Sequence, residues 1–387
     1  MTLIRVLLCS TALMSGFLVA NALAKSTTNE WVWHLPAAFP KPFVPTDNPM
    51  SHAKVELGRY LFYDKRLSVN GQMSCGSCHI QSLAFSDGKM HAVGTTGETH
   101  PKNTPSLANL VYSPNFNWAN PAVVSLETQL LSPLFGEHPV ELGLNDANFA
   151  KIQQQFAQDD KYPALFAQAF GRPFVEPQDF RIDDIAKAIA SFERSIISTN
   201  SKYDRYLAGR EHLNESEKRG MDLFFGEKAE CFHCHGSVNF NDQLMYFDGK
   251  KMQISGKAFH NTGLYDLGGG NYPDANQGLF EFTHKDSDKG KFKAPSLRNV
   301  AITAPYNHDG STATLEMVLQ NYANGGRVIT DGKYRGDGRK NPNKSDLITK
   351  IELTKQEQAD IIAFLKTLTD ENLLTNPAYA DPFLLSD

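Results

Sequence analysis

The chain has 387 residues, of which 41% are hydrophobic and 21% are charged. This balance is typical of a globular protein, because disordered chains contain fewer apolar and aromatic residues. The 38 Lys and Arg residues against 43 Asp and Glu residues give a net charge of -5, which argues against a nucleic-acid partner and against a polybasic membrane binder. A chain of this length is expected to form two domains.

The first 24 residues have the composition of a secretory signal peptide. Residues 6–20 are mostly apolar after a basic start, and Ala22–Ala24 fits a cleavage site with small residues. No later stretch approaches the roughly 18 consecutive apolar residues of a membrane span. Cys9 raises the alternative of a lipoprotein, but a large residue precedes it and the apolar stretch mostly follows it. We therefore expect an exported, periplasmic protein that begins near Lys25 and has no membrane span.

Four cysteines remain after this segment, and they form two copies of the pattern C-x-x-C-H. The copies are Cys75-Gly76-Ser77-Cys78-His79 and Cys231-Phe232-His233-Cys234-His235. This pattern is the attachment signature of c-type haem, in which two thiols bond covalently to the porphyrin and the histidine binds the iron. Disulfides, a redox-active cysteine pair and a structural zinc site are the alternatives. The adjacent histidine in each copy favours two covalently bound haems.

Both motifs lie within a longer internal repeat. A predicted amphipathic helix precedes each motif, and Asn214 with Glu217 forms a capping box for the second helix. Two further pairs of segments correspond: Pro105-Ser106-Leu107-Ala108-Asn109 with Pro295-Ser296-Leu297-Arg298-Asn299, and Ser125-Leu126-Glu127 with Thr314-Leu315-Glu316. The order in each half is therefore helix, haem motif, loop, P-S-L-x-N and a helix that begins at the L-E pair.

This order predicts a mainly α-helical fold with few short strands, made of two cytochrome c-like haem domains related by internal duplication. We assign residues 49–200 to the N-terminal domain and residues 201–372 to the C-terminal domain, joined near Ser195–Asn214. A proline-rich segment, residues 25–48, precedes them, and residues 373–387 form a C-terminal tail.

The two halves differ at the position seven residues after the leucine of each L-E pair. That position is Tyr322 in the second half and Pro133 in the first. If this helix crosses the open face of each haem, a phenolate can bind the second iron, whereas proline offers no ligand to the first. One haem would be closed and the other open to a small oxidant, which favours an enzyme over an electron carrier. Alternatively, Tyr322 is simply one of 13 tyrosines and packs in the core.

These features resemble the bacterial di-haem cytochrome c peroxidase and MauG superfamily, over roughly residues 50–368. Besides the haem motifs, the resemblance rests on residues 57–62, 103–107 and 297–310. Cytochrome c peroxidases of this superfamily carry a methionine ligand fourteen residues after the histidine that matches His308, and MauG-type proteins carry a tyrosine there. The residue here is Tyr322, which places the chain with MauG. Three more segments resemble the MbnH-like branch: 118–121, 133–141 and 261–265.

The resemblance implies a peroxide site over the haem held by His79, with Gln129, Pro133 and Glu141 above the iron. Glu141 would move a proton during peroxide cleavage, because a carboxylate shielded from water has a raised pKa. Gln129 would orient the peroxide by hydrogen bonding. On composition alone, Glu141 is a solvated surface charge. The chain also has two more residues between Gln129 and Glu141 than MauG.

The resemblance further implies that Trp118 lies between the haems and passes electrons or holes. It also implies a calcium ion bound by the side chain of Asn103 and the backbone carbonyls of Thr303 and Pro305, since calcium takes hard oxygen ligands. The simpler interpretations are core packing for Trp118 and a turn at Asn103.

Peroxidases of this superfamily carry a movable histidine ligand in a loop that here contains His91 and His100. Neither residue occupies the matching position, so we expect a permanently open haem. His233 lies within the second motif without being its ligand. His260 and His308 are expected to hydrogen-bond haem propionates or the backbone.

The leading hypothesis is a periplasmic di-haem oxidase that reacts with hydrogen peroxide at the His79 haem and oxidises a partner protein, on a tryptophan side chain by analogy with the superfamily. The haem held by His235 and Tyr322 would store the second oxidising equivalent through Trp118. One alternative is peroxide reduction with electrons from a small cytochrome c or a cupredoxin. The other is a non-enzymatic di-haem electron carrier with both irons closed.

Overall fold

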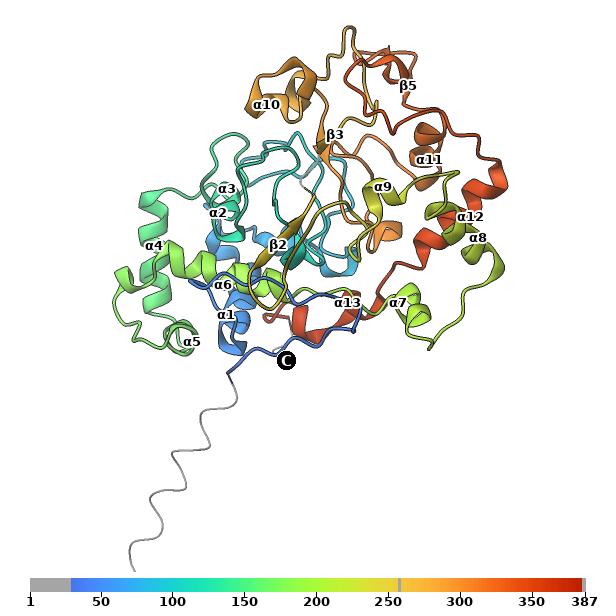
Figure 1. The fold of residues 1–387 in the computed structure, drawn as a ribbon. Helices are drawn as coiled ribbons and strands as arrows, with labels where there is room; N and C mark the ends of the chain where they lie inside the picture. The colour runs from blue at the N-terminus through green and yellow to red at the C-terminus, as the bar shows by residue number, and fades with distance from the viewer. Residues whose placement is uncertain (1–28, 257–258, 385–387) are drawn as a thin grey trace, which may run out of the picture.

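The computed structural model describes residues 29–256 and 259–384. The expected signal peptide, residues 1–24, lies outside this described part. Within it the fold is mainly helical, as predicted, and the short strands form two-stranded antiparallel pairs (Figure 1). No helix of the described segments is both long and apolar enough to cross a membrane.

The α-helices occur in the following order: α1 (His52–Tyr63), α2 (Leu126–Gln129), α3 (Leu131–Phe135), α4 (Asp146–Ala157), α5 (Tyr162–Phe170), α6 (Ile182–Ser195), α7 (Lys202–Leu207), α8 (Glu215–Phe224), α9 (Phe232–His235), α10 (Phe280–Thr283), α11 (Leu315–Ala323), α12 (Lys355–Lys366) and α13 (Glu371–Thr375). The strands are β1 (Leu244–Phe247), β2 (Met252–Ser255), β3 (Phe259–His260), β4 (Phe292–Lys293), β5 (Val328–Ile329) and β6 (Gly336–Asp337). They pair as β1 with β2, β3 with β4 and β5 with β6.

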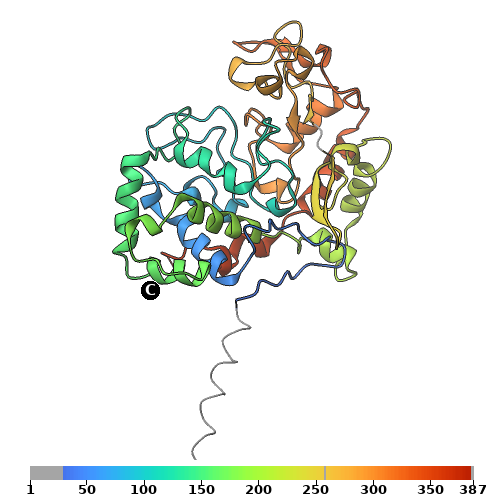
Figure 2. The same cartoon turned by 60° about the vertical axis from the view of Figure 1, so that its left-hand side comes forward.

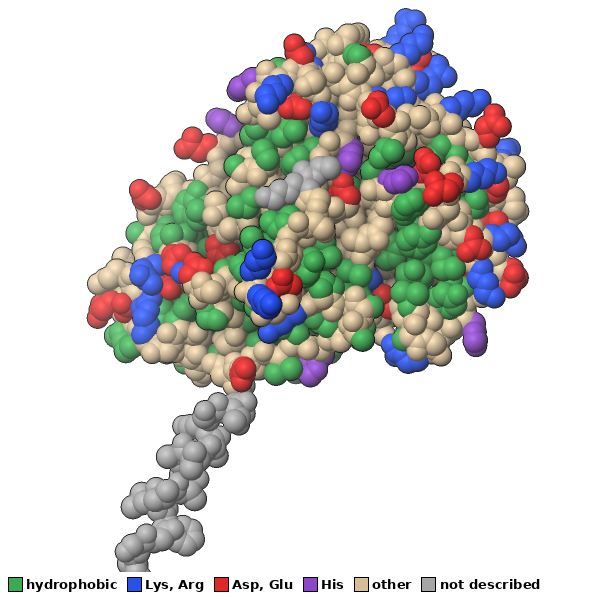
Figure 3. Space-filling view, viewed as in Figure 1, with side chains coloured by type: hydrophobic (Ala, Val, Ile, Leu, Met, Phe, Trp, Pro, Cys, Tyr) green, Lys and Arg blue, Asp and Glu red, His purple; other side chains and the backbone are tan. Residues whose placement is uncertain are grey.

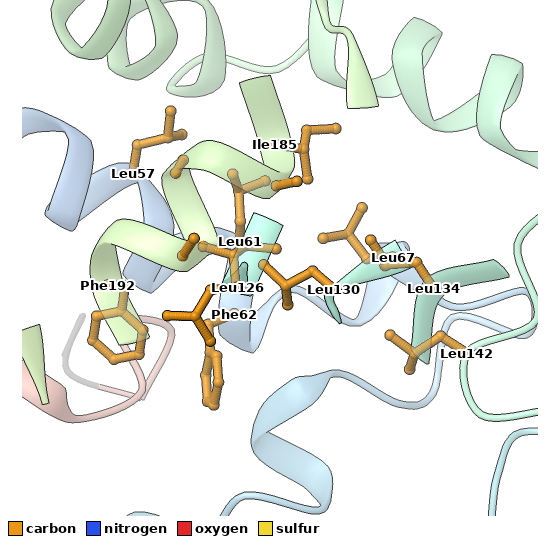
Figure 4. Close-up of a cluster of buried hydrophobic side chains, with 14 of the residues drawn as sticks. Leu57, Leu61, Phe62, Leu67, Leu126, Leu130, Leu134, Leu142, Ile185 and Phe192 are labelled. Atoms are coloured by element: carbon orange, nitrogen blue, oxygen red, sulfur yellow. The ribbon is translucent and has the colours of Figure 1, made fainter. Parts of the chain in front are cut away.

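In the N-terminal half, α1 packs against α6 and α5. The Ser51 hydroxyl caps α1 by accepting a hydrogen bond from the backbone of Lys54. The helix then buries Leu57, Leu61 and Phe62 on one face, as its apolar spacing predicts. Figure 4 shows these side chains meeting leucines of α2 and α3 and the apolar face of α6. This cluster fixes the elements on either side of the first motif.

In the C-terminal half, the pair formed by α8 and α12 takes the place of α1 and α6. The Asn214 and Glu217 capping box begins α8, which confirms that prediction. A glycine permits the close approach of the helices in both pairs. A methyl group at Gly58 would overlap the carbonyl oxygen of Ala188, and one at Gly220 would overlap that of Asp360. The repeat in the sequence therefore produces the same helix packing twice.

The P-S-L-x-N segments are also equivalent in space. Asn109 and Asn299 both adopt a left-handed backbone with φ of 61°. The hydroxyl of Ser106 donates to the carbonyl of Ala84 at 2.6 Å, and the hydroxyl of Ser296 donates to that of Asn239 at 2.7 Å. Each serine thus ties its segment to the loop that follows the haem motif of its own half.

The C-terminal end of the chain returns to the N-terminal half. Figure 2 shows α13 lying beside the blue α1 region, although the two are at opposite ends of the sequence. Leu373 joins the N-terminal core, and the amide of Gln81 donates to the carbonyl of Leu373 at 3.0 Å. The hydroxyl of Tyr63 donates to the carbonyl of Tyr379 at 2.8 Å. Residues 373–379 of the expected tail thus take part in the packing of the other half.

Candidate cofactor site

A single cavity of about 650 Å³ lies between the two halves and contacts both C-x-x-C-H motifs. All the residues that the sequence singles out for a site line it: Cys75, Cys78, His79, Asn103, Trp118, Gln129, Pro133, Glu141, Cys231, Cys234, His235, Thr303, Pro305 and Tyr322. The fold therefore gathers the predicted site residues from both halves of the chain around one internal space.

The first motif is a tight turn that directs its histidine into the cavity. The backbone N–H of His79 donates to the carbonyl of Cys75 at 2.9 Å, which closes one turn between the thiols and the imidazole. The Nδ1 of His79 lies 2.7 Å from the carbonyl of Phe85, a residue in the left-handed region with φ of 61°. Since Nδ1 is engaged by a carbonyl acceptor, Nε2 is the nitrogen that remains for a metal. Burial lowers the pKa of His79, which keeps the ring neutral.

The second motif repeats this geometry. The backbone N–H of His235 donates to the carbonyl of Cys231 at 2.9 Å, and its Nδ1 lies 2.8 Å from the carbonyl of Phe240. Phe240 also has a positive φ, of 52°. Burial lowers the pKa of His235 as well. The carbonyls of two phenylalanines with left-handed backbone conformation thus orient the two imidazoles. The sequence pattern did not identify either phenylalanine.

The thiol chemistry fits two haem groups. The cysteines of both motifs are free thiols, so the disulfide alternative finds no support in the structure. In the described residues, only one group of three His, Cys, Asp or Glu side chains could share a metal ion, and it contains no cysteine: Glu227, Glu230 and His233. The four cysteines therefore do not gather for zinc. Two thiols one turn apart, with a neutral imidazole whose Nδ1 is fixed, match the donor set of haem c in each half.

The helices that begin at the two L-E pairs both reach the cavity. Ser125 and Thr314 cap them through their hydroxyls, as the sequence indicates. Tyr322 lies in the last turn of α11, where burial and then the thiols of Cys234 and Cys231 raise the pKa of its phenol. The side chain thus lies close to the second motif. Pro133 occupies the corresponding place on α3 of the first half.

Glu141 follows α3 in a loop that the backbone holds against the cavity. The N–H of Leu142 donates to the carbonyl of Pro133 at 3.0 Å, and the N–H of Thr95 donates to the carbonyl of Glu141 at 2.8 Å. The Glu141 side chain keeps 38% of its surface exposed, yet the protein around it removes enough water to raise its pKa to about 7. A carboxyl with this pKa can both accept and release a proton near neutral pH.

Trp118 belongs to a hydrogen-bonded ladder that joins the two halves. Its indole N–H donates to the carbonyl of Asn103 at 2.9 Å, and the backbone N–H of Asn103 donates to the carbonyl of His308 at 2.8 Å. The carbonyl of Trp118 accepts from the backbone of Lys293 at 3.0 Å. These contacts hold the indole rigidly at the junction between the halves.

Asn103, Thr303 and Pro305 all line the cavity, and the backbone of Asn103 is bonded to the segment that contains the other two. The amide nitrogen of Asn103 donates to the carbonyl of Lys89 at 2.8 Å, so its oxygen is the end that remains for a cation. Thr303 and Pro305 lie in the segment just before His308, to which Asn103 is bonded. An amide oxygen with backbone carbonyls is a hard donor set of the kind that calcium takes.

The remaining histidines fall into different places. His100 lines the cavity beside Glu141, whereas His91 does not line it. His260 also lines the cavity and pairs with Asp242. His308 is 5% exposed and stacks on Phe292 at 3.5 Å between ring centroids, and its Nε2 has no partner among the described residues. Burial lowers its pKa to about 4.

Two cavity residues were not identified from the sequence. Burial lowers the pKa of Lys293 to about 8, and its ammonium donates to the carbonyl of Asn115 at 2.8 Å. Glu193 on α6 is 4% exposed and its pKa is raised to about 8 by burial. The sequence could have indicated that Glu193 is buried. It lies four residues after Ile189 and eight after Ile185, which places it on the apolar face of the helix.

The surface near the second motif is apolar. Figure 3 shows hydrophobic side chains gathered over the region of α8 and α9, with a histidine and acidic side chains at the border of this patch. Further hydrophobic side chains lie elsewhere on this face, with basic and acidic side chains scattered among them and along the edges. Phe225, the residue that directly follows α8, is a hydrophobic side chain with 37% exposure.

The comparisons with known proteins agree with this architecture. A family model described as di-haem cytochrome c peroxidase matches residues 52–212. Cytochrome-c peroxidase IdrP1 of Pseudomonas sp. (strain SCT) is 35% identical over 365 residues, which cover 91% of this chain and 90% of that protein. The methylamine utilization protein MauG of Methylorubrum extorquens is 33% identical over 328 residues, which cover 84% of this chain and 81% of that protein.

Solved structures extend the comparison to three dimensions. The crystal structure of a MauG-like protein associated with microbial copper homeostasis is 52% identical, with a TM-score of 0.86 over 91% of this chain and 99% of that chain. The di-haem peroxidase BthA of Burkholderia thailandensis has the same fold, with a TM-score of 0.64 at 22% identity over 89% of this chain and 98% of that chain.

Proposed function

This chain belongs to the family of di-haem cytochrome c peroxidases and MauG proteins, and we propose that it uses hydrogen peroxide to oxidise a partner protein. It is a haem-dependent oxidoreductase of the class that acts on peroxide. The proposed partner presents an oxidisable side chain, a tryptophan by analogy with the branch that the sequence resembles. The expected export signal and the haem motifs support a periplasmic location.

The proposed cofactors are two covalently bound haems c. Cys75 and Cys78 would bond to one porphyrin and Cys231 and Cys234 to the other, with a histidine of each motif on each iron. When bound, these haems supply a redox-active iron that reacts with peroxide and a second iron that exchanges electrons. The protein supplies the ligands, the cavity and the proton-transfer groups around them.

The difference between Tyr322 and Pro133 is the observation that carries this proposal. Both residues lie on corresponding helices that line the cavity, but only tyrosine offers an oxygen ligand. An anionic phenolate lowers the reduction potential of an iron, so this half is suited to holding an oxidising equivalent. A proline at the corresponding place leaves room for peroxide in the first half. Such unequal halves suit an oxidase better than a carrier with two closed irons.

Glu141 and Gln129 would act on peroxide in the first half. Peroxide cleavage requires a proton to move from one oxygen to the other. Glu141 lines the cavity and has a pKa of about 7, so it can take up this proton and release it. Gln129 lines the same space and can hold the peroxide by hydrogen bonding.

Trp118 is proposed to couple the two halves electronically. Its indole lines the cavity between the motifs and donates to the carbonyl of Asn103, so that its position is fixed. The partner would dock on the outside, and electrons would pass from it through the second half to the cavity. The 52% identity to a MauG-like protein associated with microbial copper homeostasis supports a MauG-like role.

The test is a peroxide reaction with purified di-haem protein, with and without each protein encoded beside it, followed by mass spectrometry. We expect a mass gain of one or more oxygen atoms, or the loss of hydrogens, on a tryptophan of one neighbour. The product should be absent with Glu141→Gln and present with Glu98→Gln, which alters another carboxylate of the cavity wall. If none of the proteins encoded beside it is modified by peroxide and the di-haem protein, the proposal is contradicted.

The second candidate is reduction of peroxide with electrons from a small cytochrome c or cupredoxin. It is favoured by the 35% identity to a protein named cytochrome-c peroxidase over nearly the whole chain. Rapid peroxide-dependent oxidation of reduced cytochrome c by the purified protein would support this candidate, and slow oxidation would support the first.

A further inference from the structure

Glu193 is a buried acid on α6 that the proposed reaction does not yet use. The residue is 4% exposed, and its Oε2 has no hydrogen-bond partner in the described part of the chain. It lines the same cavity as His79 and Glu141. A buried carboxylate without a partner is costly, so this group is expected to be neutral and to face a ligand rather than to stabilise the fold.

The neighbouring charges explain why Glu193 does not form an ion pair. The guanidinium of Arg194, the next residue, donates to both carboxylate oxygens of Glu127 on α2, at 2.7 and 2.9 Å. Burial outweighs the attraction of Arg194 and raises the pKa of Glu193 to about 8, with a further increase from Glu127. Burial also acts on Glu127, but the hydrogen bonds from Arg194 lower its pKa to about 2.

Glu193 and Glu141 approach the first motif from separate elements. Burial raises the pKa of the Cys75 thiol, and the next causes include the charges of both glutamates. Both carboxyls line the cavity that Cys75 also lines, Glu193 from α6 and Glu141 from the loop after α3. Two acids with different environments at one cavity are a common arrangement for acid and base chemistry.

We infer that Glu193 is a second acid of the peroxide site, which supplies a proton to the cavity beside Cys75. This inference rests on the proposed function. Reduction of one hydrogen peroxide to two waters breaks the O–O bond and consumes two electrons and two protons. The electrons come from the partner protein. Glu193 gives one proton and becomes a carboxylate, solvent gives the other, and solvent then reprotonates Glu193.

The first test is infrared spectroscopy of the di-haem protein without peroxide or partner. In a neutral buffer, the burial of Glu193 and the lack of a partner for its Oε2 among the described residues are expected to keep this carboxyl protonated. We expect a deuterium-sensitive carbonyl band of a carboxylic acid that persists in Glu141→Gln and disappears in Glu193→Gln. Asp184→Asn is the matched control, because Asp184 is buried on the same helix but pairs with Arg172 and Arg181. The carboxylic acid band should be unchanged in Asp184→Asn.

The second test is the rate of the peroxide reaction in variants with normal haem content. Glu193→Gln should lower the rate roughly 10-fold or more, because general acids contribute at least that much, whereas Asp184→Asn should keep it. A full carbonyl band in Glu193→Gln, or an unchanged rate despite its loss, would overturn the inference. The infrared band depends on neither peroxide nor partner. The Glu193 band and a slower peroxide reaction in Glu193→Gln, found without any oxidised partner protein, would therefore refute only the oxidation of a partner protein. The inference about Glu193 would stand.

Discussion

The imidazole Nε2 of His100 lies 3.8 Å from the carboxylate Oε1 of Glu141, and both side chains line the cavity. Nδ1 of His100 lies 3.1 Å from both the backbone nitrogen and the carbonyl oxygen of Lys102, so the Lys102 backbone orients the ring with Nε2 toward Glu141. Burial lowers the pKa of His100. His100 thus has Glu141 as a neighbour in the cavity, and that it does not bind iron remains a prediction.

The rate of the peroxide reaction should rise with pH through an inflection near 7. Glu141 accepts the peroxide proton only as a carboxylate, and its pKa is about 7, so the active form increases as pH rises, until ionisation of Glu193 near pH 8 lowers the rate again. Glu141→Gln should lower the rate by roughly 10²- to 10⁴-fold and remove the inflection. Stopped-flow spectroscopy of the haem bands measures both effects. Glu98→Gln should keep the inflection. If the inflection persists in Glu141→Gln, Glu141 does not accept the peroxide proton.

Tyr322→Met should raise the reduction potential of the second haem. Replacing an anionic oxygen donor with a neutral thioether favours the ferrous iron, and a shift on the order of 0.1 V is reasonable within the roughly 0.8 V that axial ligands span. Potentiometric titration followed by absorbance measures the shift. Tyr306→Phe is the control, because Tyr306 also lines the cavity but donates to the carbonyl of Val300. An equal potential in Tyr322→Met would show that the phenol does not bind iron.

Calcium should copurify with the protein in a ratio close to one ion per chain, and Asn103→Ala should lose most of it. The Asn103 amide oxygen is the proposed side-chain ligand beside the carbonyls of Thr303 and Pro305. Elemental analysis measures the content, and chelation followed by calcium or magnesium addition measures selectivity. Removal of the ion should slow the peroxide reaction reversibly, because these residues connect to Trp118 and His308. Equal calcium in wild type and Asn103→Ala would contradict the assignment.

Gly58→Ala and Gly220→Ala should each destabilise the protein by about 1–3 kcal/mol. An added methyl group at either position overlaps a backbone carbonyl of the partner helix, which has to move away. Denaturation followed by circular dichroism measures the change in stability. Lys218→Ala, at a half-exposed position of α8 where the ammonium pairs with Glu215, should have little effect. Similar losses at the two glycines would confirm that the duplicated helix pairs are energetically equivalent.

The helices, their caps and the haem motifs were predictable because they depend on local patterns. A capping box at Asn214, an apolar stripe at Leu57 and Leu61, and the C-x-x-C-H spacing each act within a few residues. The internal repeat then indicated which segments would correspond. The comparisons support the resulting fold and family.

The contacts between distant segments were not predictable from local patterns. The spacing of Glu193 places it on the apolar face of α6, but only the tertiary fold shows that the neighbouring Arg194 pairs with Glu127. The approach of His100 to Glu141 depends on a loop without periodic residues. The left-handed backbone at Phe85 and Phe240 is also unexpected, since bulky residues rarely adopt it.

The return of the last residues to the first half has a consequence for how the protein is made. The aromatic ring of Tyr379 lies against Phe85, and its hydroxyl donates to the carbonyl of Ser195. Residues 371–384 are synthesised after the whole of the N-terminal half. That half therefore has this part of its apolar surface covered only when the later segment has been added, and a fragment truncated after residue 200 would leave the surface bare.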